Sequence, residues 1–205
     1  MSNYSITRHK FLSAKEARQL HLVSKRLARK DMVCSRTTWV TRHLLVNLAF
    51  HTGLRVSEIA ALKVCDLYFN GKENYLIVQR GKGGKKRTVY LDSDIVSHLK
   101  HYLAMKQKWK QPVDATAPLL AGRGGEHYAT SALQYSFKKA IEQSNLPMHY
   151  SIHSARHTYA TFLLAKSKNI RFVQKQLGHA SLSMTALYSD VLPELNQSLA
   201  ETFLK

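Results

Sequence analysis

The chain has 205 residues, enough for one sizeable domain or two small ones with a buried core. Apolar residues make up 44% and charged residues 21%, a balance that excludes an intrinsically disordered chain. The 31 Lys and Arg outnumber the 13 Asp and Glu, which gives a net charge of +18. This charge indicates a polyanionic partner such as nucleic acid. Ribosomal-type and membrane-surface basic proteins have similar compositions, so composition alone does not distinguish these classes.

The first sixty residues are predicted to be helical. Ser13 and Glu16 match a capping box, which marks the start of a helix. Gly53 follows a second helical stretch and is a typical helix stop. Helices are expected over residues 14–30, 36–51 and 56–62.

Three short runs rich in β-branched and aromatic residues come next. The last two are separated by the glycine-rich segment GKGGK (81–85), which predicts a hairpin. Strands are expected over residues 64–69, 74–80 and 86–91.

The rest of the chain is predicted to be helical again, beginning at Asp92. The sequence contains no repeat, low-complexity tract or linker that indicates a second domain. We therefore expect one α+β domain over residues 1–205, mostly helical with a small antiparallel three-stranded sheet. The later helices are expected over 130–143, 153–166, 169–177, 181–187 and about 193–204.

The two cysteines and the apolar segments indicate where in the cell the protein is expected to be. Cys34 and Cys65 are outside any Cys-x-x-Cys or Cys/His metal spacing and are expected to be free thiols of a cytosolic protein. The longest apolar run, LLVNLAF (44–50), is far shorter than the ~18 residues that span a bilayer, and no secretory signal is recognised. A cytoplasmic protein without a membrane partner is expected.

Two segments place basic residues where a phosphate could bind. In TGLRVSEIAAL (52–62), Arg55 opens a helix, so that its guanidinium and backbone N–H groups can converge on one anion; a solvated surface arginine is the simpler interpretation. In GKGGKKR (81–87), Lys82 lies on a glycine turn that does not match a P-loop. The alternative for this segment is a basic hairpin that contacts DNA backbone through Arg80, Lys85, Lys86 and Arg87.

Two more segments carry histidines beside other reactive groups. In SIHSARHTYATFLLA (151–165), His153 and Arg156 share a helix face and could meet one phosphate. His153 and His157 form an HxxxH pair without the glutamate of HExxH, so no metal site is predicted. In LGHASLSMTALYSDV (177–191), His179 and Tyr188 taken singly are interpreted most simply as structural residues.

Taken together and in order, these segments resemble the tyrosine recombinase (phage integrase) family. TGLRVSEIAAL, GKGGKKRTVYL, H-x-x-R-H-T-x-A-T and LGH-x₈-Y are similar to that family's motifs and extend over essentially the whole chain. The resemblance implies a site-specific recombinase that cleaves and rejoins DNA through a 3′-phosphotyrosyl intermediate, without a metal or other cofactor. The implied catalytic residues are Arg55, Lys82, His153, Arg156, His179 and Tyr188.

The resemblance also implies a role for each residue. Tyr188 is the nucleophile, since a phenol with a pKa of about 10 leaves more easily than an alkoxide. Arg55 and Arg156 hold the non-bridging oxygens, and Lys82 protonates the leaving 5′ oxygen. His153 assists proton removal from Tyr188, and His179 donates to a phosphate oxygen. Glu58 lies one turn after Arg55 and is expected to orient its guanidinium, and His157 is expected to support the site.

The partners implied by the resemblance are double-stranded DNA at specific recombination sites and further copies of the chain, as a tetramer on DNA. The helix over 193–204 is expected to dock on a neighbouring protomer, and accessory DNA-bending factors are candidate partners. A prokaryotic cytoplasm, with nucleoid association when bound, is the implied location. Many relatives carry a helical DNA-clamping domain ahead of the catalytic one; here an excised catalytic domain and a short member similar to the fimbrial-type invertases both fit.

Several alternatives stay open at the level of sequence. A non-catalytic DNA-binding accessory protein could be built on the same fold. A type IB topoisomerase would share the phosphotyrosine chemistry but act as a monomer. A metal-dependent nuclease and a ribosomal-type RNA-binding protein fit the motifs least well.

Overall fold

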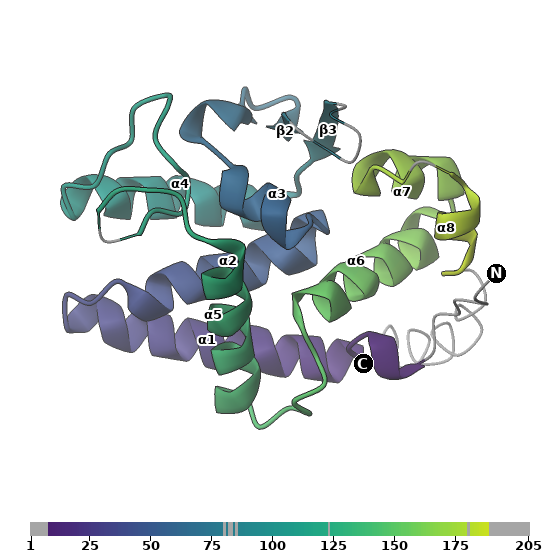
Figure 1. The fold of residues 1–205 in the computed structure, drawn as a ribbon, viewed down its shortest axis with the longest axis horizontal. Helices are drawn as coiled ribbons and strands as arrows, with labels where there is room; N and C mark the ends of the chain where they lie inside the picture. The colour runs from purple at the N-terminus through teal and green to yellow at the C-terminus, as the bar shows by residue number, and fades with distance from the viewer. Residues whose placement is uncertain are drawn as a thin grey trace.

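The computed structural model describes residues 8–79, 81, 84, 86–122, 124–179 and 181–188. The chain has an α+β fold, as predicted, with a helical body and a three-stranded antiparallel sheet along one side (Figure 1). No helix in this part of the chain is long and apolar enough to cross a membrane.

Helix α1 (Ala14–Val33) begins where the sequence predicted. The hydroxyl of Ser13 accepts a hydrogen bond from the backbone N–H of Glu16, and the Glu16 carboxylate accepts one from the backbone N–H of Ser13. This reciprocal capping box satisfies two N–H groups at the start of the helix. Leu12, just before the box, is fully buried and ties the start of α1 to the core.

Helix α2 (Thr38–Thr52) is the centre of the main core. Residues 43–49 are buried on every side of the helix. It packs against α1, α4 (Ser93–Lys108), α5 (Thr130–Gln143) and α6 (Ile152–Ser167). Burial on all faces explains why this helix lacks the amphipathic pattern that a surface helix shows. The predicted stop is confirmed, because Gly53 caps the helix in the left-handed conformation.

The sheet pairs its strands in the order β1 (Leu67–Phe69), β2 (Asn74–Val78) and β3 (Arg87–Tyr90). The predicted β2–β3 hairpin is confirmed, with Val78 opposite Arg87. The predicted first strand is shorter than expected, because residues 64–66 form a 3₁₀ turn in which Asp66 accepts a hydrogen bond from the backbone N–H of Lys63.

The remaining helices confirm the prediction to within a few residues at each end, and the predicted helix over 193–204 lies outside the described residues. Both cysteines are free and exposed. A short 3₁₀ helix at Arg8–Lys10 was not predicted. The other helices are α3 (Val56–Ala61), α4 (Ser93–Lys108), α5 (Thr130–Gln143), α6 (Ile152–Ser167), α7 (Ile170–Leu177) and α8 (Ser183–Ala186).

A second, smaller core forms between α6 and α7. Val173 and Leu177 of α7 pack there against Leu164 of α6 and the ring of Tyr188. Helix α7 also packs against β3, so it lies between the sheet and α6 (Figure 1). The α2–α3 turn, β3, α6 and α7 therefore meet in one region, and this region carries Arg55, His153, Arg156 and His179.

Candidate active site

Arg55 is placed by the sharp turn between α2 and α3. Gly53 has a φ of 59°, and a Cβ at this position would overlap the ring of Tyr159. Arg55 then takes up extended backbone angles as the N-cap of α3. The arginine stands at the opening of a helix, as predicted, and 26% of its side chain is exposed.

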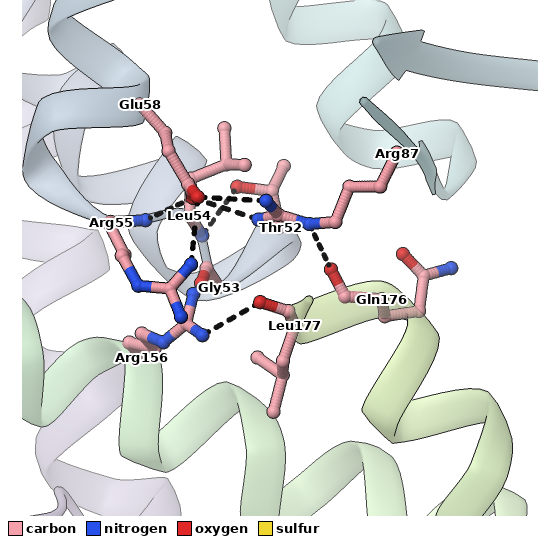
Figure 2. A network of polar contacts seen from close by, with 9 residues as sticks. All are labelled: Thr52, Gly53, Leu54, Arg55, Glu58, Arg87, Arg156, Gln176 and Leu177. Atoms are coloured by element: carbon pink, nitrogen blue, oxygen red, sulfur yellow. Dashed lines mark hydrogen bonds and ion pairs between the residues drawn. The ribbon is translucent and has the colours of Figure 1, made fainter. Parts of the chain in front are cut away.

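Glu58 binds two arginines at once (Figure 2). Its Oε2 accepts from the backbone N–H of Arg55 at 2.8 Å, and its Oε1 accepts from Nη1 of Arg55 at 2.9 Å. Nη1 and Nη2 of Arg87 donate to the same two oxygens, each at 2.8 Å. Burial alone would raise the pKa of Glu58, but the hydrogen bonds and charge of Arg87, followed by those of Arg55, lower this pKa to about 2. Glu58 is therefore ionised at neutral pH and contacts Arg55 directly.

Arg156 in α6 lies close to Arg55 and is buried (Figure 2). Its Nη1 donates to the carbonyl of Gly53, and its Nη2 donates to the carbonyl of Leu177 at 2.8 Å. One guanidinium thus joins the α2–α3 turn to the end of α7. Burial, together with the charge of Arg55, lowers the pKa of Arg156 to about 10, which leaves the group positive at neutral pH. Each terminal nitrogen keeps a second hydrogen that an anion can accept.

His153 lies one helical turn before Arg156, on the surface of α6. Residues three apart share a helix face, so both side chains are available to one anion. Partial burial of the ring, followed by the charges of Arg156 and Arg55, lowers the pKa of His153. The positive field of the two arginines therefore extends to this histidine.

The hydroxyl of Tyr188 contacts His157. It lies 3.0 Å from Nδ1 of the imidazole, and the tyrosine side chain is 2% exposed. Burial, followed by the charges of Arg156 and His153, lowers the pKa of His157 to about 4, so the neutral ring can accept the phenolic hydrogen. The family resemblance implies that His153 assists proton removal from Tyr188. In the structure the hydroxyl contacts His157, which was expected only to support the site.

The ring of His179 also contacts the phenol ring of Tyr188. Gly178 ends α7 with a φ of 65° and directs His179 back toward Tyr188. The two rings are stacked, with 6.2 Å between centroids and 11° between planes, and Nδ1 of His179 lies 3.0 Å from the hydroxyl of Thr185. Burial, followed by the charges of Arg156 and Arg55, lowers the pKa of His179 to about 4.

The predicted residues of the hairpin have different outcomes. Arg80, Lys82 and Lys85 lie outside the described residues. Lys86 is exposed beside the turn. The side chain of Arg87 points inward and is only 11% exposed, so its contacts in the structure are with the protein itself.

Gln176 belongs to the site region but was not anticipated. Its backbone carbonyl accepts from Nε of Arg87 at 3.1 Å, and its side-chain oxygen accepts from the backbone N–H of Tyr90 at 3.1 Å. A glutamine on an amphipathic helix is ordinarily solvated, and no local pattern marked this one. Its role depends on the packing of α7 against β3.

The charge of this region comes from arginine side chains. Within the described part of the chain, no group of three His, Cys, Asp or Glu side chains is arranged to hold a metal ion. The HxxxH pair of α6 is engaged differently, since Nδ1 of His157 contacts Tyr188. What the region can do chemically is to hold an anion between guanidinium groups beside a phenol.

Comparisons with known proteins identify relatives of this chain. The model of the phage integrase family matches residues 10–194. Tyrosine recombinase XerC of Neisseria meningitidis serogroup B (strain ATCC BAA-335 / MC58) is 39% identical over 150 residues, which are 73% of this chain and 48% of the relative. XerC of Listeria monocytogenes serovar 1/2a (strain ATCC BAA-679 / EGD-e) is 34% identical over 166 residues, or 79% of this chain and 52% of the relative. The chain spans about half the length of these curated relatives.

Solved structures share the fold. XerH site-specific recombinase bound to palindromic difH substrate, a post-cleavage complex, superposes with a TM-score of 0.74 at 23% identity, covering 95% of this chain and 53% of that one. A lambda integrase tetramer bound to a Holliday junction gives a TM-score of 0.63 at 22% identity, covering 92% of this chain and 49% of that one. Identities this low establish the fold and not the activity.

Proposed function

Since the chain belongs to the phage integrase family, we propose that it is a tyrosine-type site-specific recombinase of double-stranded DNA. The observation that carries the proposal is that the buried hydroxyl of Tyr188 contacts His157 and its ring stacks on His179, while the charge of Arg156 acts on both of these histidines. The names of the XerC relatives support this assignment, and the net charge of +18 suits a DNA substrate.

The proposed reaction exchanges one phosphoester for another. The oxygen of Tyr188 attacks the scissile phosphorus, a 3′-phosphotyrosyl bond forms, and the bond from phosphorus to the 5′ oxygen breaks. Lys82 is proposed to protonate that leaving oxygen, so a free 5′-hydroxyl is released. Attack by a 5′-hydroxyl of a partner strand reverses the step and regenerates the phenol, because the phosphotyrosine keeps the energy of the original bond.

The cations are proposed to stabilise the five-coordinate phosphate. Arg156 is fixed by two backbone carbonyls and Arg55 by Glu58, so both guanidinium groups are positioned before the substrate arrives. Their remaining hydrogens would bind the two non-bridging oxygens, with His153 and His179 as further donors. Fixed donors need little reorganisation as charge develops on the phosphate.

His157 is proposed to take the proton of Tyr188 at the start of the reaction. Its Nδ1 contacts the hydroxyl, and burial followed by the surrounding positive charges lowers its pKa to about 4. A bound phosphodiester would offset these charges and make His157 a stronger base. His153, the partner that the family resemblance implies, would take over this role if Tyr188 moves toward the phosphate.

The assembly is also proposed by analogy. One solved neighbour is a tetramer on a Holliday junction, which supports a homo-oligomer on DNA. The apolar residues of the expected helix over 193–204 would dock on a neighbouring protomer, and residues 1–205 would form a single catalytic domain. We also propose that accessory DNA-bending factors take part, and that the protein acts in a prokaryotic cytoplasm and associates with the nucleoid when bound to DNA.

Covalent capture tests the function without knowledge of the target site. A library of nicked duplexes with a randomised core is incubated with the protein in EDTA, and adducts are separated on a denaturing gel and sequenced. We expect the wild type to form adducts on a narrow set of sequences. Tyr188→Phe should bind the same DNA and form none.

Three outcomes would contradict parts of this proposal. Binding without any adduct by the wild type would make the chain a non-catalytic DNA-binding protein. An adduct that persists in Tyr188→Phe would place the nucleophile elsewhere. Adducts that vanish in EDTA and return with magnesium would contradict catalysis by the side-chain cations.

A further inference from the structure

Arg87 occupies an unusual position for a residue in a basic stretch. It follows Lys86 directly and opens strand β3, opposite Val78. Lys86 is exposed, whereas the Arg87 side chain is 11% exposed and turned toward the α2–α3 turn (Figure 2). An arginine that serves only to contact DNA backbone would have little reason to place all three guanidinium nitrogens on protein oxygens.

The first of these contacts sets the state of Glu58. Nη1 and Nη2 of Arg87 occupy both oxygens of Glu58 at 2.8 Å. Arg55 therefore shares Oε1 through a single side-chain nitrogen, at 2.9 Å. If Arg87 were removed, the buried Glu58 carboxylate would have only Arg55 as a cationic partner among the hydrogen bonds described. Arg55 would then be drawn into a bidentate pair with Glu58 and away from a bound phosphate.

The second contact reaches the turn that carries His179. Nε of Arg87 donates to the carbonyl of Gln176 at 3.1 Å. A Cβ on Gly178 would lie 2.8 to 3.0 Å from Cδ, Nε and Cζ of Arg87, so the guanidinium and its stem pack directly on this glycine. The position of Arg87 thus depends on the same turn that directs His179.

We propose that Arg87 is a positioning residue that links the β2–β3 hairpin to Arg55 through Glu58, and to His179 through the Gly178 turn. The inference rests on the proposed recombinase function. Arg87 acts through its bidentate hydrogen bonds to Glu58 and does not bind a DNA phosphate.

Arg87→Lys and Arg87→Gln distinguish a positioning role from a contact to DNA phosphate. Lysine keeps the positive charge but cannot form the bidentate pair with Glu58, and glutamine removes both. We expect both variants to slow single-turnover cleavage of a captured nicked substrate at saturating protein by roughly 100-fold. The DNA dissociation constant should stay within about twofold of wild type. The slope of log affinity against log salt should be unchanged, whereas Lys86→Gln should reduce it by about 0.9.

A matched control and a double-mutant cycle guard against a simple folding defect. Arg36 is the matched control, because it also pairs with a carboxylate, that of Asp31 at 3.0 Å, but has no role in the proposed site. The Arg36→Gln variant should cleave at the wild-type rate. If Arg87 and Glu58 act as one unit, the variant carrying Glu58→Gln and Arg87→Gln should lose much less activity than the two single losses multiplied together. Multiplied losses would indicate independent roles and overturn the proposal.

The remaining outcomes distinguish this inference from the proposed function. A wild-type cleavage rate in Arg87→Lys, or a salt slope reduced by about 0.9 in Arg87→Gln, would overturn the positioning role alone. Absence of any adduct with the wild-type protein would overturn the proposed function and the inference with it. Normal cleavage by wild type and slow cleavage by both Arg87 variants, at unchanged affinity, would support the inference.

Discussion

Nδ1 of His157 lies 3.0 Å from the hydroxyl of Tyr188, so the proposed nucleophile is held by a neutral imidazole inside a small apolar core. Tyr188 therefore serves both packing and chemistry. Its ring packs with Val173 and Leu177 in this core. Its hydroxyl contacts His157, which lies within the influence of the positive charge of Arg156.

Replacement of His157 by glutamine should slow the formation of the covalent adduct by about 100-fold at saturating DNA, because the group in contact with the phenolic proton is lost. The measurement is single-turnover adduct formation on a captured substrate. His149→Gln, an exposed histidine of the loop before α6, serves as the control. If His153→Gln stops the reaction while His157→Gln proceeds at the wild-type rate, the proton instead leaves through His153.

Arg156→Lys should lower both stability and cleavage. A lysine cannot reach the carbonyls of Gly53 and Leu177 together, so at least one buried charge-assisted hydrogen bond is lost. We expect the free energy of unfolding to fall by about 2 to 4 kcal/mol in urea titrations at neutral pH. Arg55→Lys is the comparison, because its side chain is 26% exposed, and it should cost about 1 kcal/mol or less. Equal losses in the two variants would argue against the anchoring role of Arg156.

Gly53 is required for space as well as for its backbone conformation. Gly53→Ala should lower the free energy of unfolding by about 3 kcal/mol, since it adds overlap with the Tyr159 ring to the cost of a positive φ. Gly71→Ala is a matched control, because Gly71 has a φ of 85° and a Cβ added there would meet no neighbouring atom within 4 Å, so it should cost about 1 kcal/mol. Thermal or urea unfolding of the two variants measures the difference. Similar losses would show that the contact with Tyr159 is unimportant.

Features that depend on neighbouring residues could be predicted from the sequence. The capping box of Ser13 and Glu16 and the helix stop at Gly53 act within one helical turn, so short patterns identify them. The hairpin was recognisable for the same reason, from a glycine-rich segment between two β-rich runs. The 3₁₀ turn formed with Asp66 was missed, because apolar and aromatic residues around it continue the strand pattern.

Contacts between distant segments could not be predicted in this way. The sequence places Arg87 in a basic run typical of a DNA contact, but its partner Glu58 is 29 positions away and only the folded sheet brings them together. The contact between His157 and Tyr188 likewise depends on α7 and α8 folding back over α6. Order along the chain identified the set of candidate residues, and the fold determined which of them touch.

Three histidines form a polar cluster where α1, α2 and α4 meet. The rings of His21 and His43 are 5.1 Å apart, and those of His43 and His98 are 4.7 Å apart. Asn47 bridges His21 and His98, and Ser24 contacts Nδ1 of His43. Burial, followed by the neighbouring histidines, lowers the pKa of His43 to about 3. The pKa of His98 falls to about 4, mainly through burial and the charge of His101.

This cluster predicts a loss of stability in mild acid. In the unfolded chain a histidine binds a proton below a pH of about 6.5, whereas folded His43 stays neutral until about pH 3. Between these values the unfolded state binds more protons, so the free energy of unfolding falls as the pH is lowered, by about 1.4 kcal/mol per pH unit for each such histidine. Urea titrations between pH 7 and pH 5 measure the slope. His43→Asn, which keeps a donor near Ser24, should reduce that slope by about 1.4 kcal/mol per unit below pH 6, and a slope that does not change would place the acid sensitivity in other residues.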